Sequence, residues 1–274
     1  MAKHSESLGD QWRCLLDDPE QAIPGMALTI AQEGGTREVW KHVTASRETV
    51  LLAFPQEASI RGAVVVQGEP GGELKAKTVC PLLEGIPNDM TIDEVHPWKS
   101  GVEGNVSARR NEDGEPLWFY TPFLFRDRED LTPEVRQTIL LAGLAYGLRR
   151  ALVDELTISS GPNYEEYAAA WLKENPGKTR LDVPQLKLPL AGARILEPGG
   201  LACEYQLRAP ITSVKAVNFG PETVYLLYLR FGLHTENPLE LAIYASAKVC
   251  NNYVPQPDDE IDAYIWLQGR LIDI

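Results

Sequence analysis

The chain has 274 residues, of which 44% are hydrophobic and 24% are charged. These proportions are those of a soluble folded protein, so they exclude a disordered chain, a collagen and a long coiled coil. The formal net charge of −13 argues against binding to nucleic-acid backbones or anionic membranes, because both need a positively charged face.

The cysteines and the N-terminus bear on the cellular compartment. The four cysteines lie far apart in the sequence, at Cys14, Cys80, Cys203 and Cys250. The sequence has no C-x-x-C pair, which argues against a disulfide framework and against a zinc site. The first residues lack the apolar core of a signal peptide, and no apolar stretch reaches the roughly 18 residues of a membrane span. We therefore expect a cytoplasmic protein with buried, reduced thiols.

Residues 1–100 are predicted to form a β-rich N-terminal region, after a short helix that ends before Pro19. Short apolar runs that are bounded by glycine or proline turns are typical of antiparallel strands. The expected strands span residues 27–30, 38–42, 50–54, 60–67 and 75–80. The first two flank a predicted turn at residues 33–36. Three prolines predict an irregular segment over residues 81–101.

Residues 101–197 are predicted to contain a hairpin and two helices, either as one domain with residues 1–100 or alone. The hairpin strands, residues 102–110 and 117–125, flank a turn at residues 111–114. Thr132 is a good helix N-cap, and Pro133 suits the first helical position. The long apolar run that follows predicts a buried central helix over residues 132–152.

The second predicted helix spans residues 163–174. Asn163 and Glu166 make a start that resembles a capping box. One face of this helix is apolar or aromatic and holds Tyr164, Tyr167, Ala168, Trp171 and Leu172. Residues 176–200 are rich in proline and glycine, which indicates an extended linker and a domain boundary near residue 198.

Residues 198–274 are predicted to form a C-terminal domain like a small β-barrel. The expected strands span residues 204–208, 211–219, 224–231, 239–245 and 260–267. With one short helical turn, this pattern resembles an OB-like barrel, with chance β patterning as the alternative. Residues 102–125 and 211–233 share a strand–turn–strand pattern, which leaves an internal repeat open. The predicted class is α+β and β-rich, with antiparallel sheets or small barrels, a buried central helix and a second amphipathic helix.

The catalytic motifs are missing, so we predict no catalytic residue and no cofactor. The sequence contains no P-loop, no G-x-G-x-x-G and no G-x-S-x-G. Its four histidines, His4, His42, His96 and His234, leave a distant Ser–His or Cys–His pair open, but nothing selects one.

Two clusters are candidate sites. Carboxylate and imidazole ligands for a metal could come from Asp89, Asp93, Glu94 and His96. The alternative is a solvated turn above Trp98. The acidic residues among 258–262 could likewise bind a metal or a basic partner, but a solvent-exposed turn is the favoured interpretation.

The second cluster is aromatic and would bind a ligand. Trp118 and Tyr120 share one face of a predicted strand, and Arg109 lies on the neighbouring strand. Such rings stack on bases or sugars in OB-like folds, and an arginine can hold an anion. Packing of the rings into the core is the alternative.

These observations favour a non-catalytic cytoplasmic protein that binds a macromolecular partner, with a protein as the expected partner class. The first alternative is a small-ligand or metal-binding protein, or an enzyme, with its site at residues 89–98. The second alternative is single-stranded nucleic-acid binding through an OB-like face, which the net charge disfavours. No membrane contact is expected.

Overall fold

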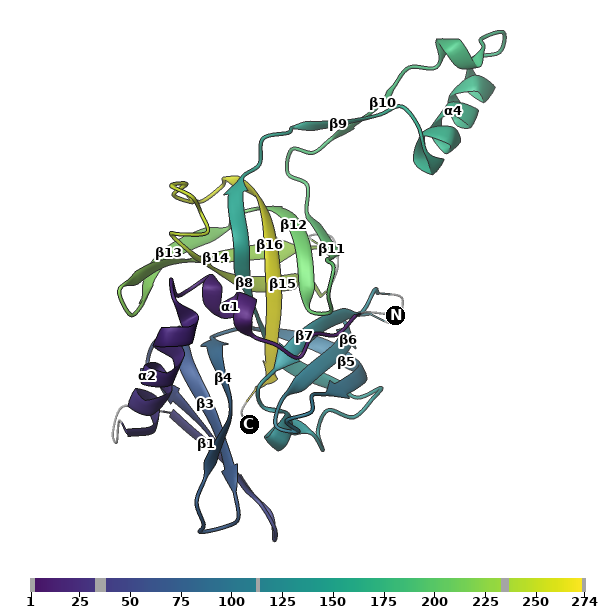
Figure 1. Ribbon diagram of the computed structural model, residues 1–274. Coiled ribbons are helices and arrows are strands. Elements are labelled where there is room, and N and C mark those ends of the chain that lie inside the picture. The colour runs from purple at the N-terminus through teal and green to yellow at the C-terminus, as the bar shows by residue number, and fades with distance from the viewer. Residues whose placement is uncertain (1–2, 33–37, 112–113, 233–236, 273–274) are drawn as a thin grey trace. The chain divides into compact units, whose positions relative to one another are not determined.

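The computed structural model describes residues 3–32, 38–111, 114–232 and 237–272 (Figure 1). The fold is α+β and strand-rich, with 48% of the residues in strands and 15% in helices. Its sheets are antiparallel and mixed. The chain divides into two compact units. Unit 1 joins Met1–Arg150 with Arg194–Ile274, and unit 2 is Ala151–Ala193. None of the helices among the described residues is long and apolar enough to span a membrane.

Unit 1 begins with two helices and a four-stranded antiparallel sheet. The helices are α1 (Gly9–Arg13) and α2 (Pro19–Gln32). The strands lie in chain order, as β1 (Glu38–Val43), β2 (Glu48–Phe54), β3 (Ile60–Gly68) and β4 (Lys75–Leu83). All four strands confirm the expected positions. Ile30 of α2 is buried against Val50, Leu52 and Val64 of the sheet.

Helix α2 corrects one expectation, because residues 27–30 were predicted to be a strand. The apolar side chains Ile23, Met26, Ala27 and Ile30 repeat with the helical period of three and four residues. The helix packs closely on β3: a Cβ atom at Gly62 would lie only 2.8 Å from Met26 Sδ. The predicted turn at residues 33–36 lies outside the described residues.

The second sheet of unit 1 has ten strands, whose order is β11-β12-β16-β7-β6-β5-β8-β15-β14-β13. Short helix α3 (Leu124–Asp127) precedes β8. The strands are β5 (Ile86–Pro97), β6 (Gly104–Arg109), β7 (Leu117–Thr121), β8 (Arg136–Arg150), β11 (Ile195–Pro198), β12 (Glu204–Pro210), β13 (Ser213–Phe219), β14 (Glu222–Phe231), β15 (Leu239–Ser246) and β16 (Glu260–Leu271).

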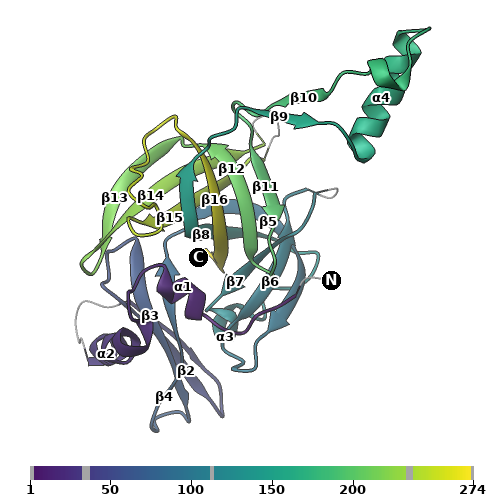
Figure 2. The same cartoon turned by 45° about the horizontal axis from the view of Figure 1, so that its top comes forward.

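Strand β8 shows that the predicted central helix is wrong. It pairs with β16, beside which it lies in Figure 2, and with β5 and β15. Its side chains enter two buried clusters, with Leu141 in one and Leu144 in the other. A strand buried on both faces is apolar throughout, as a buried helix also is, so periodicity does not separate the two. The cap-like residues Thr132 and Pro133 lie in a turn, in which Glu134 has φ of 65°.

Strand β5 corrects the prediction of an irregular segment at residues 81–101. Its pairing with β6 shifts register between Ile92 and Glu94, which is a β-bulge. Pro97 ends the strand, and Pro81 belongs to β4, where its carbonyl accepts a hydrogen bond from Gln268 Nε2 at 2.8 Å. The prolines therefore lie within and at the ends of strands.

The two halves of the large sheet make matching pairings around the antiparallel pair β8–β16. β5 lies antiparallel to β8, as β12 does to β16. β15 lies parallel to β8, as β7 does to β16. This pattern equates β7 with β15, whereas the sequence comparison of residues 102–125 with 211–233 had matched β7 with β14.

Unit 2 contains a two-stranded antiparallel ribbon and one long helix. The ribbon is formed by β9 (Glu155–Ile158) and β10 (Leu186–Pro189). Helix α4 (Pro162–Glu174) confirms the second predicted helix, and a 3₁₀ turn η1 (Arg180–Asp182) follows it. The helix begins after Gly161, whose φ of 93° suits glycine, and Pro162 occupies the first turn. The side chains of Tyr164, Ala168 and Val183 are buried between these elements.

Candidate functional site

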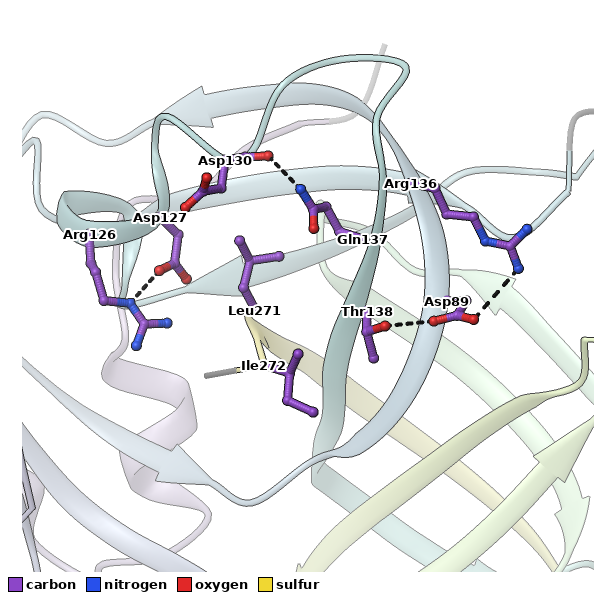
Figure 3. A pocket seen from close by; sticks show the side chains of 9 residues that line it. All are labelled: Asp89, Arg126, Asp127, Asp130, Arg136, Gln137, Thr138, Leu271 and Ile272. Carbon is purple, nitrogen blue, oxygen red and sulfur yellow. Dashed lines mark hydrogen bonds and ion pairs between the residues drawn. The ribbon is translucent and has the colours of Figure 1, made fainter. Parts of the chain in front are cut away.

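The four residues of the candidate metal cluster have different neighbours. Asp89 lines a pocket with Arg136 and Thr138, and its carboxylate accepts a hydrogen bond from Thr138 Oγ1 at 2.7 Å (Figure 3). Asp93 forms an ion pair with Arg109. The structure therefore places Asp89 and Asp93 in separate interactions, although both come from β5.

The pocket in Figure 3 is lined by charges that already have partners within the protein. Arg136 lies 3.7 Å from Asp89, and Arg126 forms an ion pair with Asp127. Gln137 Nε2 donates to the Asp130 carbonyl at 3.1 Å. The two ion pairs engage four of the five charged side chains on the described lining of the pocket.

Of the other two residues of the metal cluster, His96 belongs to an imidazole stack and Glu94 acts on that stack through its charge. The rings of His96 and His4 are stacked with their centroids 4.0 Å apart. Burial and the neighbouring His96 lower the pKa of His4, and Glu94 opposes that shift. Among the described residues, no group of three His, Cys, Asp or Glu side chains could hold a metal ion.

The candidate ligand residues are also held by protein groups. Arg109 contacts Asp93 and also Glu134, at 2.7 Å. Trp118 lies edge-on to the ring of His4, at 4.7 Å between centroids. Tyr120 is fully buried, and its hydroxyl donates to Glu103 Oε2 at 2.6 Å.

Glu103 is a buried carboxyl that the sequence did not single out. Burial raises its pKa, while hydrogen bonds from Tyr120 and Ser100 act in the opposite direction. The Ser100 hydroxyl donates to Oε1 at 3.0 Å, so both carboxylate oxygens accept a hydrogen bond from the protein. This geometry holds the loop between β5 and β6 rather than presenting a free acid to a substrate. No local signal near Glu103 predicts its burial.

The N-terminal segment, residues 3–17, covers part of this polar face. His4 Nδ1 lies 3.0 Å from Asn105 Nδ2, and Asn105 Oδ1 accepts a hydrogen bond from Trp98 Nε1 at 3.1 Å. Stacking of a base or sugar on Trp118 would therefore require this segment to leave its present position.

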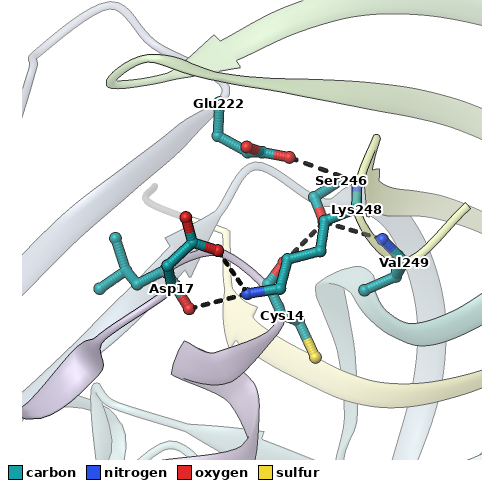
Figure 4. A network of polar contacts seen from close by, with 7 residues as sticks. Cys14, Asp17, Glu222, Ser246, Lys248 and Val249 are labelled. Carbon is teal, nitrogen blue, oxygen red and sulfur yellow. Dashed lines mark hydrogen bonds and ion pairs between the residues drawn. The ribbon is translucent and has the colours of Figure 1, made fainter. Parts of the chain in front are cut away.

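The end of the N-terminal segment is anchored by β15 and the turn that follows it (Figure 4). Ser246 Oγ donates to the Cys14 carbonyl at 2.6 Å, and Lys248 Nζ lies 2.9 Å from Asp17 Oδ1. Burial raises the pKa of the Cys14 thiol to about 12, so this cysteine is not a nucleophile. The contacts of Ser246 and Lys248 hold the N-terminal segment in place.

Unit 2 carries a disproportionate share of the exposed apolar side chains among the described residues. The described residues include eleven exposed large hydrophobic side chains, and five of them belong to unit 2: Leu152, Val153, Leu156, Leu181 and Leu188. Unit 2 holds only 43 of the 274 residues. The side chain of Leu181 is 97% exposed. The sequence did not single out these side chains as a site. Leu181 and Leu188 lie in residues 176–200, which were predicted to be an extended linker.

The ribbon of unit 2 has one apolar face that is only half covered. Ile158 pairs with Leu186, and both pack against the cluster of Tyr164, Ala168 and Val183. The next pair on the same face is exposed. It consists of Leu156 and Leu188. The small core of unit 2 thus continues onto an uncovered surface.

No family model, no curated protein and no solved structure matches this chain.

Proposed function

We propose that the chain is a non-catalytic binding protein that docks a partner protein on unit 2. The observation that carries this proposal is the exposed pair Leu156 and Leu188, which continues the apolar face of the ribbon beyond its own core. Exposed apolar side chains that gather in one place mark interaction sites, whereas scattered single ones do not.

The small size of unit 2 supports the same proposal. Units of about 40 residues seldom bury enough surface to be stable, and an isolated two-stranded ribbon is marginal in water. In unit 2 only Tyr164, Ala168 and Val183 are buried hydrophobic side chains. A partner that covers Leu156 and Leu188 would add to this core, so binding and stabilisation of unit 2 would be coupled.

The partner would be a protein segment with apolar side chains. Both strands of the ribbon have a free edge among the described residues, because β9 and β10 pair only with each other. Such an edge can accept a further strand through main-chain hydrogen bonds, with side chains supplying specificity. A nucleic acid would instead need a basic face, and Glu155 and Lys187 on the opposite face of the ribbon neutralise each other at 2.8 Å.

The other interpretations have less support. A ligand or metal site at residues 89–98 and an OB-like nucleic-acid face both start from residues that contact protein groups, as for Arg109 and Tyr120. The cytoplasm is the location we propose, because all four cysteines are buried free thiols.

The proposal is tested by isolating the tagged chain from the cells that make it, followed by quantitative mass spectrometry. The test variant is Leu156→Asp with Leu188→Asp, and Val254→Asp, an equally exposed apolar residue of unit 1, is the control. We expect one protein at a fixed ratio to the chain, present with wild type and control but lost with the double variant. Identical sets of proteins in all three samples would contradict the proposal.

A further inference from the structure

A second pocket of unit 1 contains two arginines, Arg110 and Arg194. It has a volume of about 260 Å³, just below the usual range of about 300–1,000 Å³ for small-molecule sites. Its described walls come from residues 110–111 and 114–117 between β6 and β7, from β11 and the residue before it, from β12, and from the facing ends of β14 and β15. The side chains that matter here are Arg110, Leu117, Arg194, Tyr205, Phe231 and Leu239.

Both arginines lack a carboxylate partner among the described residues. Arg110 donates to the Asn237 carbonyl and Arg194 donates to the Arg230 carbonyl, each at 2.8 Å. The Nε atom of Arg194 is buried and has no hydrogen-bond partner in the described part of the chain. Ten other arginines of this acidic chain form ion pairs.

Partial burial makes this arrangement costly without an anion. Arg110 is half-buried, and burial lowers its pKa. A desolvated guanidinium is stabilised by a bound anion, and its planar fork suits the two oxygens of a carboxylate. The only carboxylate on the described lining, Glu115, is exposed to water, which screens its repulsion of a bound anion.

Tyr205 supplies a third donor. Its hydroxyl oxygen accepts the backbone N–H of Trp118 at 2.6 Å, which fixes the position of the phenol. The hydroxyl proton itself has no acceptor among the described residues, so it can be donated to a ligand. Tyr205 is only 3% exposed, and a buried donor of this kind gains from a partner.

We propose that this pocket binds a small molecule that carries a carboxylate on an apolar body. Arg110, Arg194 and Tyr205 hold the carboxylate oxygens. The apolar body packs against Leu117, Phe231 and Leu239, which distinguishes this ligand from a free inorganic anion. The proposal is independent of the docking of a partner on unit 2.

The test uses the full chain with benzoate and hexanoate as probes, titrated by calorimetry. Benzyl alcohol serves as the neutral analogue and inorganic phosphate as the anion without an apolar body. A ligand of roughly nine heavy atoms at ordinary efficiency is detectable at about 10 mM. We expect at least one carboxylate to bind, with benzyl alcohol and phosphate at least about tenfold weaker, because the site uses charge and apolar contact together.

Variants locate the binding. Arg110→Gln and Arg194→Gln should each weaken the carboxylate about tenfold or more, whereas Arg149→Gln, an exposed arginine elsewhere in unit 1, should not. If either variant unfolds, the Nε–H signal of Arg194 in the wild-type NMR spectrum gives the answer, because it should shift on addition of the carboxylate.

Four results would overturn the proposal. They are no binding of either carboxylate, binding as tight as wild type in both arginine variants, phosphate binding as tightly as the carboxylates, and an Arg194 Nε–H signal that does not respond.

Discussion

Leu156 and Leu188 lie directly opposite each other in the β9–β10 ribbon, so both side chains project from the same face. They are 45% and 38% exposed, whereas the neighbouring pair Ile158 and Leu186 on that face packs against the core of unit 2. The same apolar face therefore has a covered end and an uncovered end. This relationship, rather than any catalytic constellation, is the basis of the proposed docking function.

Two glycines of β8 test whether this segment is a strand, as in the structure, or the helix that the sequence predicted. At Gly143 a Cβ atom would lie 2.7 Å from Ile243 Cδ1 and 3.1 Å from Ile265 Cδ1. Gly143→Ala should therefore destabilise the chain by about 1–3 kcal/mol, the usual cost of overpacking. Gly147 has nothing within 4 Å of its Cβ position, so Gly147→Ala should be close to neutral.

Urea unfolding of the two variants measures this difference. In a helix, both substitutions would stabilise the chain, by up to about 1 kcal/mol each, because alanine has a higher helix propensity than glycine. Equal stabilisation by Gly143→Ala and Gly147→Ala would therefore contradict the strand.

Strand β8 also shows where sequence reasoning reaches its limit. The N-terminal strands and helix α4 could be predicted, because their patterns are local: β-branched runs between turns, and a stripe of aromatic and small residues after Pro162. β8 could not, since its two faces are buried by side chains from strands that lie far away in the chain. Without pairing information, Thr132 and Pro133 resemble a helix start.

The candidate sites were unpredictable for the same reason. Leu156 meets Leu188 only across the ribbon, and Arg110 shares a pocket with Arg194 only after the strands assemble. The two residues of each pair lie far apart in the sequence, so no motif with a fixed spacing reveals either pair. The candidates that sequence did suggest were local runs on β5 and β7, and the structure gives those side chains partners within the protein, as for Asp93 and Tyr120.

Glu103 should make stability depend on pH in a definite direction. Burial raises its pKa in the folded chain, so the folded state keeps the proton to higher pH than the unfolded state does. The free energy of unfolding therefore loses a contribution as the pH rises from about 4.3, the ordinary value for Glu, through the folded pKa. In the Glu103→Gln variant the side chain at this position does not titrate, so this loss of stability is absent.

Urea unfolding at several pH values from 4 to 8 compares wild type with Glu103→Gln. We expect the variant to gain stability relative to wild type as the pH rises, with other titrating groups cancelling in the comparison. A stability difference that stays constant over this range would show that Glu103 titrates alike in both states.

The cysteines should be inert while the chain is folded. All four are buried, and burial raises the pKa of Cys14 to about 12 and that of Cys250 to about 11. Alkylation needs the thiolate, so iodoacetamide at pH 8 should add to none of them in buffer and to all four in urea. Mass spectrometry counts the adducts. An adduct that forms on the native chain as fast as on a free thiol would contradict this burial.

Unit 2 should open locally more often than unit 1. Helix α4 packs on a core of only three buried side chains, whereas β8 and β16 lie in the middle of the large sheet. Hydrogen exchange measured by mass spectrometry should show α4 amides exchanging well before those of β8 and β16. Equal protection of α4 and β8 would mean that unit 2 needs no partner for stability.

Photo-crosslinking in the cells that make the chain tests the docking proposal most directly. A photoreactive residue is placed at position 156 or 188 in unit 2, or at position 254 in unit 1 as the control. We predict a single cross-linked protein of reproducible mass from positions 156 and 188, and none from position 254. Covering the exposed parts of two leucines that are 45% and 38% exposed contributes about 1–2.5 kcal/mol. The adduct formed from position 156 should therefore weaken strongly when Leu188 is also replaced by Asp. The same diffuse adducts from all three positions would contradict the account.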